Sequence, residues 1–408
     1  MSSAASTLGF REVLQSPEVK RLWLAQIVSI FGDFLAIFAV FSVVTFQLHG
    51  TATQVSMIMA AYLTPLALIS PLAGVFVDKW NIKATMIASD VIRGCLVVAL
   101  IFVRDLHAIY AIFFLLSTVS SFYFPAQSIA VRTLAPPGGL ISVNALMTQA
   151  MQASQVVSPA VSGGLVVALG ANACFIYDVA SFFISAALIA SLPIGGSKPA
   201  AAQTSVVRSL GDGFRFIFTH PVISFVMISM TCGMFAVRCF GTLLSVYVRD
   251  VLHSTAGLFG TLNSLIGVGM ILGTQVVRRA AARVSPQHLV MTGLAGMGVS
   301  VFVTALFGMI ASTAVGMLAL GFFAGFNMVT SQTLVQQETP QAMLGRVSSS
   351  LMSLMAVSQV LAMFFAGPVA EYSGLRNLYF GSAVMLVAVA GAGLVWMRRG
   401  KAAATAAA

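Results

Sequence analysis

Five charged side chains lie inside long apolar runs of the sequence, where they could bind and release protons or pair with one another. The acids are Asp33, Asp90 and Asp178, and the bases are Arg93 and Arg238. An ionisable group within a membrane-spanning helix costs free energy, so each is a candidate functional residue. Further polar side chains that could line a hydrated pathway lie in the same runs: Gln26, Tyr123, Gln127, Gln152, Gln155 and Asn327.

The composition places these charges in an integral membrane protein. The chain has 408 residues, of which 59% are hydrophobic and 8% charged, and its mean hydropathy is +0.98. A soluble domain carries roughly 25% charged residues. No N-terminal apolar stretch leads to a small-residue cleavage site, so we expect the first apolar run to stay as an anchor. The cysteines are scattered and indicate neither a disulfide framework nor a metal site.

Twelve apolar segments are each about long enough to cross a bilayer, which takes roughly 20 helical residues. They are 22–48, 54–77, 84–103, 107–131, 142–169, 172–193, 221–248, 257–277, 287–309, 312–335, 347–371 and 375–397. Residues 8–21 predict a short interfacial helix that is interrupted at Pro17, and residues 206–220 predict an amphipathic helix.

The second half of the chain repeats the first with a constant offset. Leu-His-Gly-Thr-Ala at 48–52 matches Leu-His-Ser-Thr-Ala at 252–256, which is a shift of 204 residues (252 minus 48). The same shift matches further pairs: Pro136 with Pro340, Ser154-Gln155-Val156 with Ser358-Gln359-Val360, Gly163 with Gly367, and Gly170 with Gly374. Because each half has an even number of segments, the two copies are a parallel duplication about an axis along the membrane normal.

The repeat predicts an all-α membrane protein with 12 transmembrane helices in two pseudo-symmetric six-helix bundles. The bundles are expected at 1–195, which includes the interfacial helix, and at 221–408, with a cytoplasmic linker at 196–220. Under the shift, Asp33 falls on Val237, next to Arg238. We therefore expect these two charges to face one central cavity, as a pair or as a switch sensitive to protons and substrate. A structural salt bridge and two separately satisfied charges are the alternatives.

Two further charge positions are interpreted as structural. Asp90 and Arg93 are three residues apart on the third segment, so they can pair with each other or with the nearby loop that contains Asp78. We favour a structural or gating role for them over substrate contact. Asp178, near the outer end of the sixth segment, is interpreted as a helix-packing residue.

A short charged turn, Gly74-Val75-Phe76-Val77-Asp78-Lys79-Trp80-Asn81-Ile82-Lys83, joins the second and third segments. Its charges should lie at the membrane–water boundary, because they are expensive in hydrocarbon. On the fifth segment, Pro159 frees a backbone carbonyl that can bend the helix, while Gly163 and Gly164 permit close helix approach.

The basic residues gather in the loops of one side of the membrane. These are Arg11, Lys20, Arg21, Lys79, Lys83, Arg132, Lys198, Arg208, Arg215, Arg278, Arg279, Arg283, Arg346, Arg398, Arg399 and Lys401. The other side has Arg104, Arg249 and Arg376. Positive loops stay inside, so we expect a multi-pass plasma (inner) membrane protein with both termini in the cytoplasm. The net charge of +10 then points to membrane lipid as a partner and not to nucleic acid.

The chain resembles one branch of the major facilitator superfamily, the drug–proton antiporters with macrolide-efflux and enterobactin-exporter proteins, also described as transmembrane secretion effectors. The matching stretches are 22–26, 29–33, 74–83, 90–93, 158–164, 173–185 and 340–347. Gly74, Asp78, Lys79 and Lys83 correspond to the family's loop between the second and third helices, with Asn81 where a second glycine is usual. Pro159, Gly163 and Gly164 resemble the antiporter motif of the fifth helix, with Ser158 where glycine is usual.

The resemblance implies export by alternating access, in which two bundles rock about a central site. It implies that Asp78, with Asp90 and Arg93 nearby, helps to latch the cytoplasmic side against the start of the eleventh helix, near residues 345–350. The fourth-helix arginine of many proton antiporters has no match within 107–131, where Arg132 lies at the end.

The predicted function is a secondary active exporter of small amphipathic compounds, coupled to protons and monomeric. A transporter of lysophospholipid or of another amphiphile, and a uniporter of another small solute, are open alternatives. An enzyme is not indicated, because the sequence has no nucleophile–base or metal-ligand spacing, and no cofactor or metal is expected.

Overall fold

The computed structural model describes residues 8–77, 79–194, 206–281 and 283–407, and in these ranges every regular element is a helix. Eleven helices of the described chain are long and apolar enough to cross a membrane. The prediction of an all-α membrane fold is confirmed. The second predicted segment, 54–77, differs from the expectation because it forms two shorter helices.

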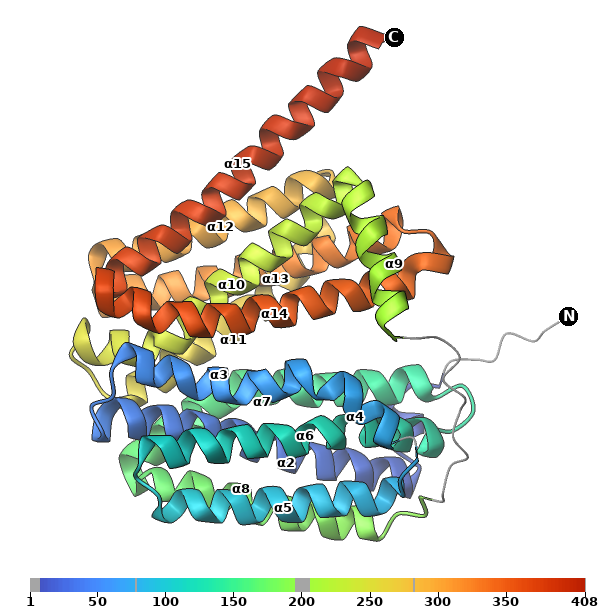
Figure 1. The fold of residues 1–408 in the computed structure, drawn as a ribbon, viewed down its shortest axis with the longest axis vertical. Coiled ribbons are helices and arrows are strands. Elements are labelled where there is room, and N and C mark those ends of the chain that lie inside the picture. The colour runs from blue at the N-terminus through green and yellow to red at the C-terminus, as the bar shows by residue number, and fades with distance from the viewer. Residues whose placement is uncertain (1–7, 78, 195–205, 282, 408) are drawn as a thin grey trace, which may run out of the picture. The chain divides into compact units, whose positions relative to one another are not determined.

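The helices divide into two compact units (Figure 1). Unit 1 consists of Met1–Gly50, Ile58–Ala201 and Thr255–Thr261, and unit 2 consists of Thr51–Met57, Ala202–Ser254 and Leu262–Ala408. Each unit thus contains one half of the chain together with a short segment from the other half. These two segments begin the helices α3 and α11.

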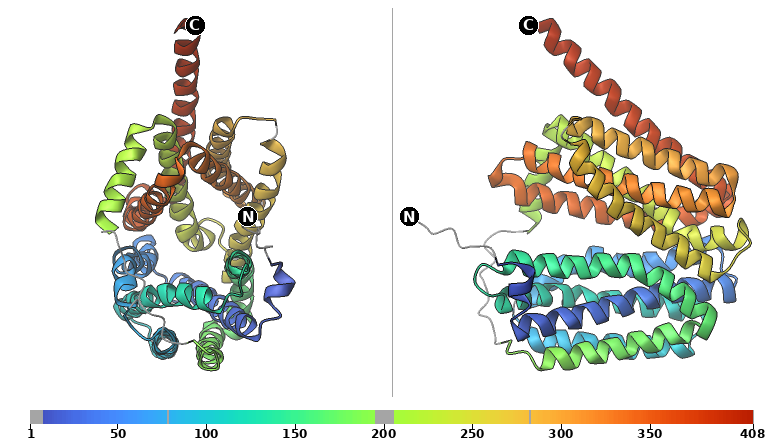
Figure 2. Two further views of the ribbon diagram at one scale, coloured as in Figure 1. Left: turned by 90° about the vertical axis from the view of Figure 1, so that its right-hand side faces the viewer. Right: turned by 180° about the vertical axis from the view of Figure 1, so that it is seen from behind.

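In unit 1, α2 and α8 run side by side in opposite directions (Figures 1 and 2). Helix α2 also packs against α7, and α5 packs between α6 and α8. The helices numbered in this half are α1 (Phe10–Val13), α2 (Pro17–Ser42) with the π-helical turn η1 (Val43–Gln47), α3 (Ala52–Leu68), α4 (Ser70–Val77), α5 (Ile82–Phe102), α6 (Leu106–Leu134), α7 (Leu140–Leu169) and α8 (Ala171–Ala190).

Unit 2 is built in the same way, with α12 packed between α13 and α15 and α10 packed against α14. The amphipathic helix α9 lies against α14 and α10. The helices numbered in this half are α9 (Val206–Thr219), α10 (Pro221–Asp250), α11 (Ala256–Ala280), α12 (Pro286–Phe307), α13 (Ile310–Glu338), α14 (Gln341–Ser373) and α15 (Leu375–Ala407).

Two proline positions explain where the helices depart from the predicted segments. Pro17 does not interrupt a helix; it occupies the first turn of α2, where its missing N–H needs no partner, and the Ser16 side chain caps the helix by accepting from the Val19 N–H. The break between α3 and α4 falls at Ile69. Pro71, two residues later, has no backbone N–H to donate, so the helical hydrogen-bond ladder is interrupted there.

The backbone carries the repeat that the sequence predicts. His49 and His253 are the described non-glycine residues with positive φ, at 49° and 47°, and they are 204 residues apart. Gly170 and Gly374, also 204 residues apart, have φ angles of 84° and 90°. Such conformations are uncommon for residues with a side chain, so their recurrence at equivalent turns confirms the duplication.

Equivalent glycines also allow equivalent close contacts. Within unit 1, a Cβ added to Gly163 of α7 would lie 2.8 Å from the Ala256 carbonyl oxygen. Within unit 2, a Cβ added to Gly367 of α14 would lie 2.9 Å from the Ala52 carbonyl oxygen. Glycine at both positions therefore lets a helix backbone approach the first turn of α11 or α3.

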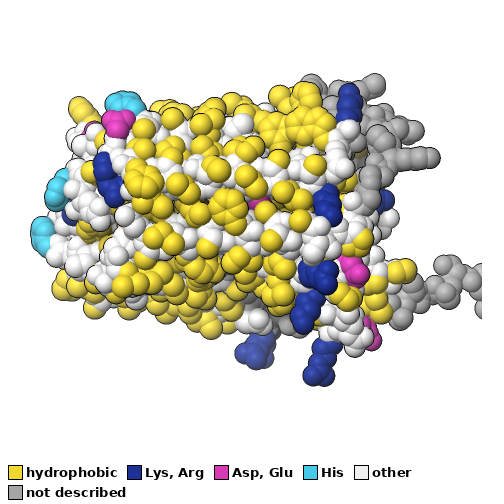
Figure 3. Space-filling view, turned by 90° about the horizontal axis from the view of Figure 1, so that it is seen from below, with side chains coloured by type: hydrophobic (Ala, Val, Ile, Leu, Met, Phe, Trp, Pro, Cys, Tyr) yellow, Lys and Arg dark blue, Asp and Glu magenta, His cyan; other side chains and the backbone are white. Residues whose placement is uncertain are grey.

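The surface has the distribution expected of a membrane protein. Figure 3 shows a face covered by hydrophobic side chains through its middle, with lysine and arginine side chains gathered toward one end and histidines at the other. Many large apolar side chains are exposed along the helices, as suits contact with lipid.

Candidate functional site

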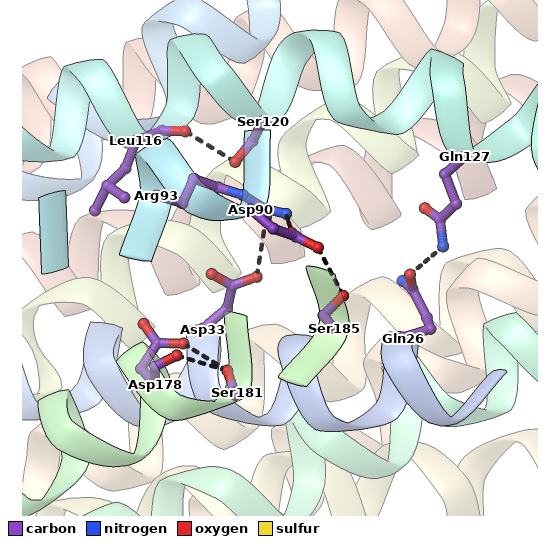
Figure 4. Close-up of polar contacts among 10 residues, drawn as sticks. All are labelled: Gln26, Asp33, Asp90, Arg93, Leu116, Ser120, Gln127, Asp178, Ser181 and Ser185. Atoms are coloured by element: carbon purple, nitrogen blue, oxygen red, sulfur yellow. Dashed lines mark hydrogen bonds and ion pairs between the residues drawn. The ribbon is translucent and has the colours of Figure 1, made fainter. Parts of the chain in front are cut away.

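Three helices of unit 1 bring four of the predicted charges together (Figure 4). Asp33 comes from α2, Asp90 and Arg93 come from α5, and Asp178 comes from α8. Arg93 lies between the first two acids, with Nη1 3.6 Å from Asp33 Oδ2 and Nη2 2.5 Å from Asp90 Oδ1. The sequence predicted the pairing of Asp90 with Arg93, and only the fold brings Asp33 and Asp178 into the same cluster.

The Asp90–Arg93 pair is the buried centre of this cluster. Asp90 is 0% exposed and Arg93 is 2% exposed. The second carboxylate oxygen of Asp90 accepts a hydrogen bond of 2.7 Å from the Ser185 hydroxyl on α8. The expected pairing of Asp90 with Arg93 is therefore present, and a hydroxyl from a neighbouring helix completes it.

Two aromatic rings contact the Arg93 guanidinium. Its central carbon lies 4.3 Å from the ring centroid of Tyr123 and 4.5 Å from that of Phe182. Cation–π contacts of this kind stabilise a desolvated positive charge without neutralising the carboxylates around it. Tyr123, predicted to line the pathway, thus lies beside the charge cluster.

Asp33 is the accessible acid of the cluster. Its side chain is 30% exposed, whereas that of Arg93 is 3% exposed. Its separation of 3.6 Å from Arg93 is that of an ion pair without a short hydrogen bond. Asp33 is therefore the carboxylate best placed to exchange a proton with water.

Asp178 is buried beside the same cluster but contacts no cation there. It is 1% exposed, and the Ser181 hydroxyl lies 3.3 Å from its Oδ1. Gly32 makes room for it, because a Cβ on that residue would lie 2.5 Å from Asp178 Oδ1. Asp178 thus packs against the helix that carries Asp33, and its interpretation as a helix-packing residue stays a prediction.

The cluster contains more acids than bases. Two carboxylates contact one guanidinium and a third, Asp178, lies beside them, so full ionisation would leave excess negative charge in a low-dielectric environment. Binding of a proton by one carboxylate reduces that excess. The arrangement can therefore hold a proton and respond electrostatically to its release.

Gln26 and Gln127 lie together at a separate place in unit 1. The Gln127 amide nitrogen donates to the Gln26 carbonyl oxygen, and both side chains are buried between α6 and α2 (Figure 4). Their predicted place in a substrate pathway stays a prediction.

Arg238 has a polar partner within unit 2. Its Nε donates a hydrogen bond of 2.7 Å to Gln359 Oε1 on α14. Asp33 pairs with Arg93 in unit 1, so each member of the expected Asp33–Arg238 pair has a partner in its own unit. The pairing of Asp33 with Arg238 stays a prediction.

The remaining predicted pathway residues have different environments. Asn327 is buried, and its amide donates to the Ser229 hydroxyl and the Val290 carbonyl, which ties α13 to α10 and α12. Gln152 is exposed and Gln155 is half-buried on α7. Asn327 thus has structural contacts, and the place of all three residues in a substrate pathway stays a prediction.

The predicted gate motif is only partly described. Asp78 lies outside the described residues. Lys79 is exposed, and Lys83 Nζ donates a 2.9 Å hydrogen bond to the Leu192 carbonyl at the end of unit 1's last helix. Gly74 has no atom within 4 Å of an added Cβ, so its surroundings there do not require glycine. The latch implied for this loop stays a prediction.

The fifth-segment motif lies on α7. Pro159 and Gly163 are buried, while Gly164 is exposed and an added Cβ on it would meet nothing within 4 Å. The adjacent Ser162 hydroxyl donates to the Leu35 carbonyl of α2. The buried side of the motif therefore serves helix contact.

Sequence reasoning missed the residues that complete the sites. Ser181 and Ser185 follow Asp178 by three and seven positions, so the three form a polar stripe on one face of an apolar helix. That spacing could have indicated them. Phe182 and Gln359 act through tertiary contacts, and no local pattern distinguishes them from other apolar or polar helix residues.

The described residues include no group of three or more His, Cys, Asp or Glu side chains that could hold a metal ion. An internal repeat and charges buried among spanning helices are typical of membrane transporters. The model of the Major Facilitator Superfamily matches residues 22–362, and the chain belongs to that superfamily, whose members are transporters.

The relatives include drug efflux proteins at low identity. Macrolide efflux protein A of Streptococcus pyogenes is 22% identical over 383 residues, which cover 90% of this chain and 93% of that protein. The multidrug efflux pump Tap of Mycobacterium tuberculosis is 23% identical over 381 residues, 90% of each chain. Among solved structures, the nucleoside transporter NupG superposes with a TM-score of 0.77 at 15% identity and covers 93% of this chain and 98% of its own.

Proposed function

We propose that this protein exports small amphipathic compounds by alternating access and that inward proton flow drives the export. The observation that carries the proposal is the charge cluster of unit 1. Asp33 is accessible, while Asp90, Arg93 and Asp178 behind it are buried. A proton taken up by Asp33 would weaken its attraction to Arg93 and so couple proton binding to the packing of α2 against α5.

The relatives support the substrate class without identifying the substrate. Two of them are named as a macrolide efflux protein and a multidrug efflux pump. The excess of basic residues in one set of loops supports cytoplasmic termini. With that orientation, export moves compounds away from the basic side of the protein.

The test is transport by purified protein in liposomes. A pH gradient is imposed and uptake of ethidium and of a radiolabelled macrolide is measured for the native protein and for Asp33→Asn. We expect gradient-driven uptake by the native protein, loss of that uptake with a protonophore, and loss in Asp33→Asn to the level of empty liposomes. The substitution removes the ionisable group with little change in volume.

The matched control is Asp105→Asn. Asp105 is exposed at the start of α6, where it accepts from the Ala108 N–H, and asparagine is an equally good cap. We expect this variant to transport like the native protein. Uptake that depends on neither the gradient nor Asp33 would contradict proton coupling and favour uniport.

A further inference from the structure

Unit 2 contains a positive charge, Arg238, that forms no ion pair with an acid among the described residues. Arg238 lies in the middle of α10. The acids in this half of the chain lie on α9 or near the ends of helices: Asp212, Asp250, Glu338 and Glu371. A guanidinium at membrane depth costs free energy unless water or an anion compensates it.

The partner of Arg238 orients it without neutralising it. Gln359 Oε1 accepts from Arg238 Nε at 2.7 Å, and Gln359 Nε2 donates 3.2 Å to the Met355 carbonyl of its own helix. Both the oxygen and the nitrogen of the Gln359 amide are thus hydrogen-bonded, and this fixes the oxygen toward Arg238. A glutamine supplies a dipole and no charge, so the guanidinium keeps its full positive charge.

The terminal nitrogens of Arg238 are free to bind another group. Within the part of the chain that the structure describes, the guanidinium donates through Nε alone, and its side chain is half-buried. Nη1 and Nη2 together present a planar fork of N–H donors that matches the two oxygens of a carboxylate or phosphate.

Arg93 shows what a charge-compensated guanidinium looks like in the same protein. It is 2% exposed and contacts two carboxylates and two aromatic rings, and its buried Nε has no hydrogen-bond partner among the described residues. Arg238 has neither carboxylate nor ring contact among the described residues of unit 2. The difference indicates that Arg238 binds a negatively charged partner that unit 2 itself does not supply.

We propose that Arg238, oriented by Gln359, binds an anionic group, a carboxylate or a phosphate, on the compounds that this protein transports. The inference rests on the proposed transport function and narrows its substrates to amphiphiles with a negative group. Arg238 would contact the ligand, and Gln359 would be a positioning residue.

The test is equilibrium binding to the purified full-length protein in nanodiscs, with no pH gradient. The probes are 11-(dansylamino)undecanoic acid and its methyl ester, which differ in one negative charge. Lysophosphatidic acid and monoolein, added as competitors, test a phosphate head against an uncharged one. We expect the native protein to bind the acid about 10- to 100-fold more tightly than the ester, as suits hydrogen bonds to a charged group.

Variants then test whether the preference for the acid over the ester depends on the Arg238 guanidinium. Arg238→Gln should lower the affinity for the acid to the value for the ester and leave the affinity for the ester unchanged. Arg238→Lys, which keeps the charge but loses the fork, should retain part of the preference. Gln359→Leu should weaken acid binding while ester binding stays constant. Arg376→Gln, which removes an exposed arginine at the start of α15, is the control and should bind as the native protein does.

Several results would overturn the proposal. An anion site is excluded if the native protein binds the dansyl acid and its methyl ester with equal affinity. It is also excluded if the protein neither binds the dansyl acid nor shows competition by lysophosphatidic acid. Equal weakening of both probes in Arg238→Gln assigns the arginine a structural role, such as pairing with Asp33. If Arg238→Gln does not fold, the proposal is still tested by the affinities of the native protein and of Arg238→Lys for the acid and the ester. Binding is measured without a pH gradient, so its result does not depend on whether the protein exports compounds with protons. The two proposals can therefore fail separately.

Discussion

At the scale of single residues, the three acids of unit 1 differ in what surrounds them. Asp90 has a guanidinium and a hydroxyl, Asp33 has a guanidinium and partial exposure, and Asp178 has a hydroxyl alone. Asp90 is therefore the acid whose ionised form is best compensated. We assign it to holding Arg93 in place, whereas Asp33 is the acid that exchanges protons in the proposed export mechanism.

Loss of the Asp90 carboxylate should destabilise the fold. Asp90→Ala leaves Arg93 buried with one distant carboxylate, and removing one partner of a buried pair costs about 3–5 kcal/mol. We expect a clear fall in the midpoint of thermal unfolding in detergent, measured by intrinsic fluorescence. Asp250→Ala breaks the more exposed pair of Asp250 with Arg249, worth at most about 1 kcal/mol, and is the control. Equal shifts in the two variants would contradict this assignment.

The sequence anticipated part of this cluster for a physical reason. The spacing of Asp90 and Arg93 places both on one helix face, so their pairing is local and readable. The approach of Asp178 to Asp33 depends on how α8 packs against α2 at Gly32, which no periodicity encodes. The Ser185 bond to Asp90 is non-local in the same way.

At the scale of helices, glycine positions decide how closely backbones approach. Apolar length predicted most spanning helices, because hydrophobic thickness alone sets that requirement. It did not predict the break of the second segment at Ile69, since proline can either bend or end a helix. The repeat, by contrast, correctly pairs Gly163 with Gly367, and each permits a close backbone contact in its own unit.

Adjacent glycines of α7 should respond oppositely to the same substitution. In Gly163→Ala the new Cβ would meet the Ala256 carbonyl, so α7 and the first turn of α11 must separate, at a cost of about 1–3 kcal/mol. In Gly164→Ala the Cβ meets nothing, and the better helix propensity of alanine should stabilise by up to about 1 kcal/mol. Thermal midpoints of the two variants provide the comparison. A Gly163→Ala variant as stable as the native protein would show that this contact is not tight.

Gly367→Ala tests the equivalent contact of unit 2. The added Cβ would lie 2.5 Å from the Thr53 Cα and 2.9 Å from the Ala52 carbonyl oxygen, so we expect a loss of stability at least as large as that in Gly163→Ala. Gly381, on α15 and with no atom within 4 Å of an added Cβ, provides its control as Gly381→Ala. An effect confined to one of the two units would mean that the duplication preserved the glycine without preserving its role.

At the scale of the whole molecule, the charge distribution predicts the orientation in the membrane, and labelling can test it in each unit separately. In a background with its four cysteines replaced by serine, single cysteines are placed at Lys79 and Arg104, which flank α5, and at Ser285 and Met309, which flank α12. A membrane-impermeant maleimide should label intact cells at positions 104 and 309 and should reach 79 and 285 only after permeabilisation, because the basic loops stay inside. Inverted labelling in both units would reverse the orientation and, with it, the direction of transport. Inversion in one unit alone would contradict a parallel duplication, since two copies related by an axis along the membrane normal must present equivalent loops to the same side.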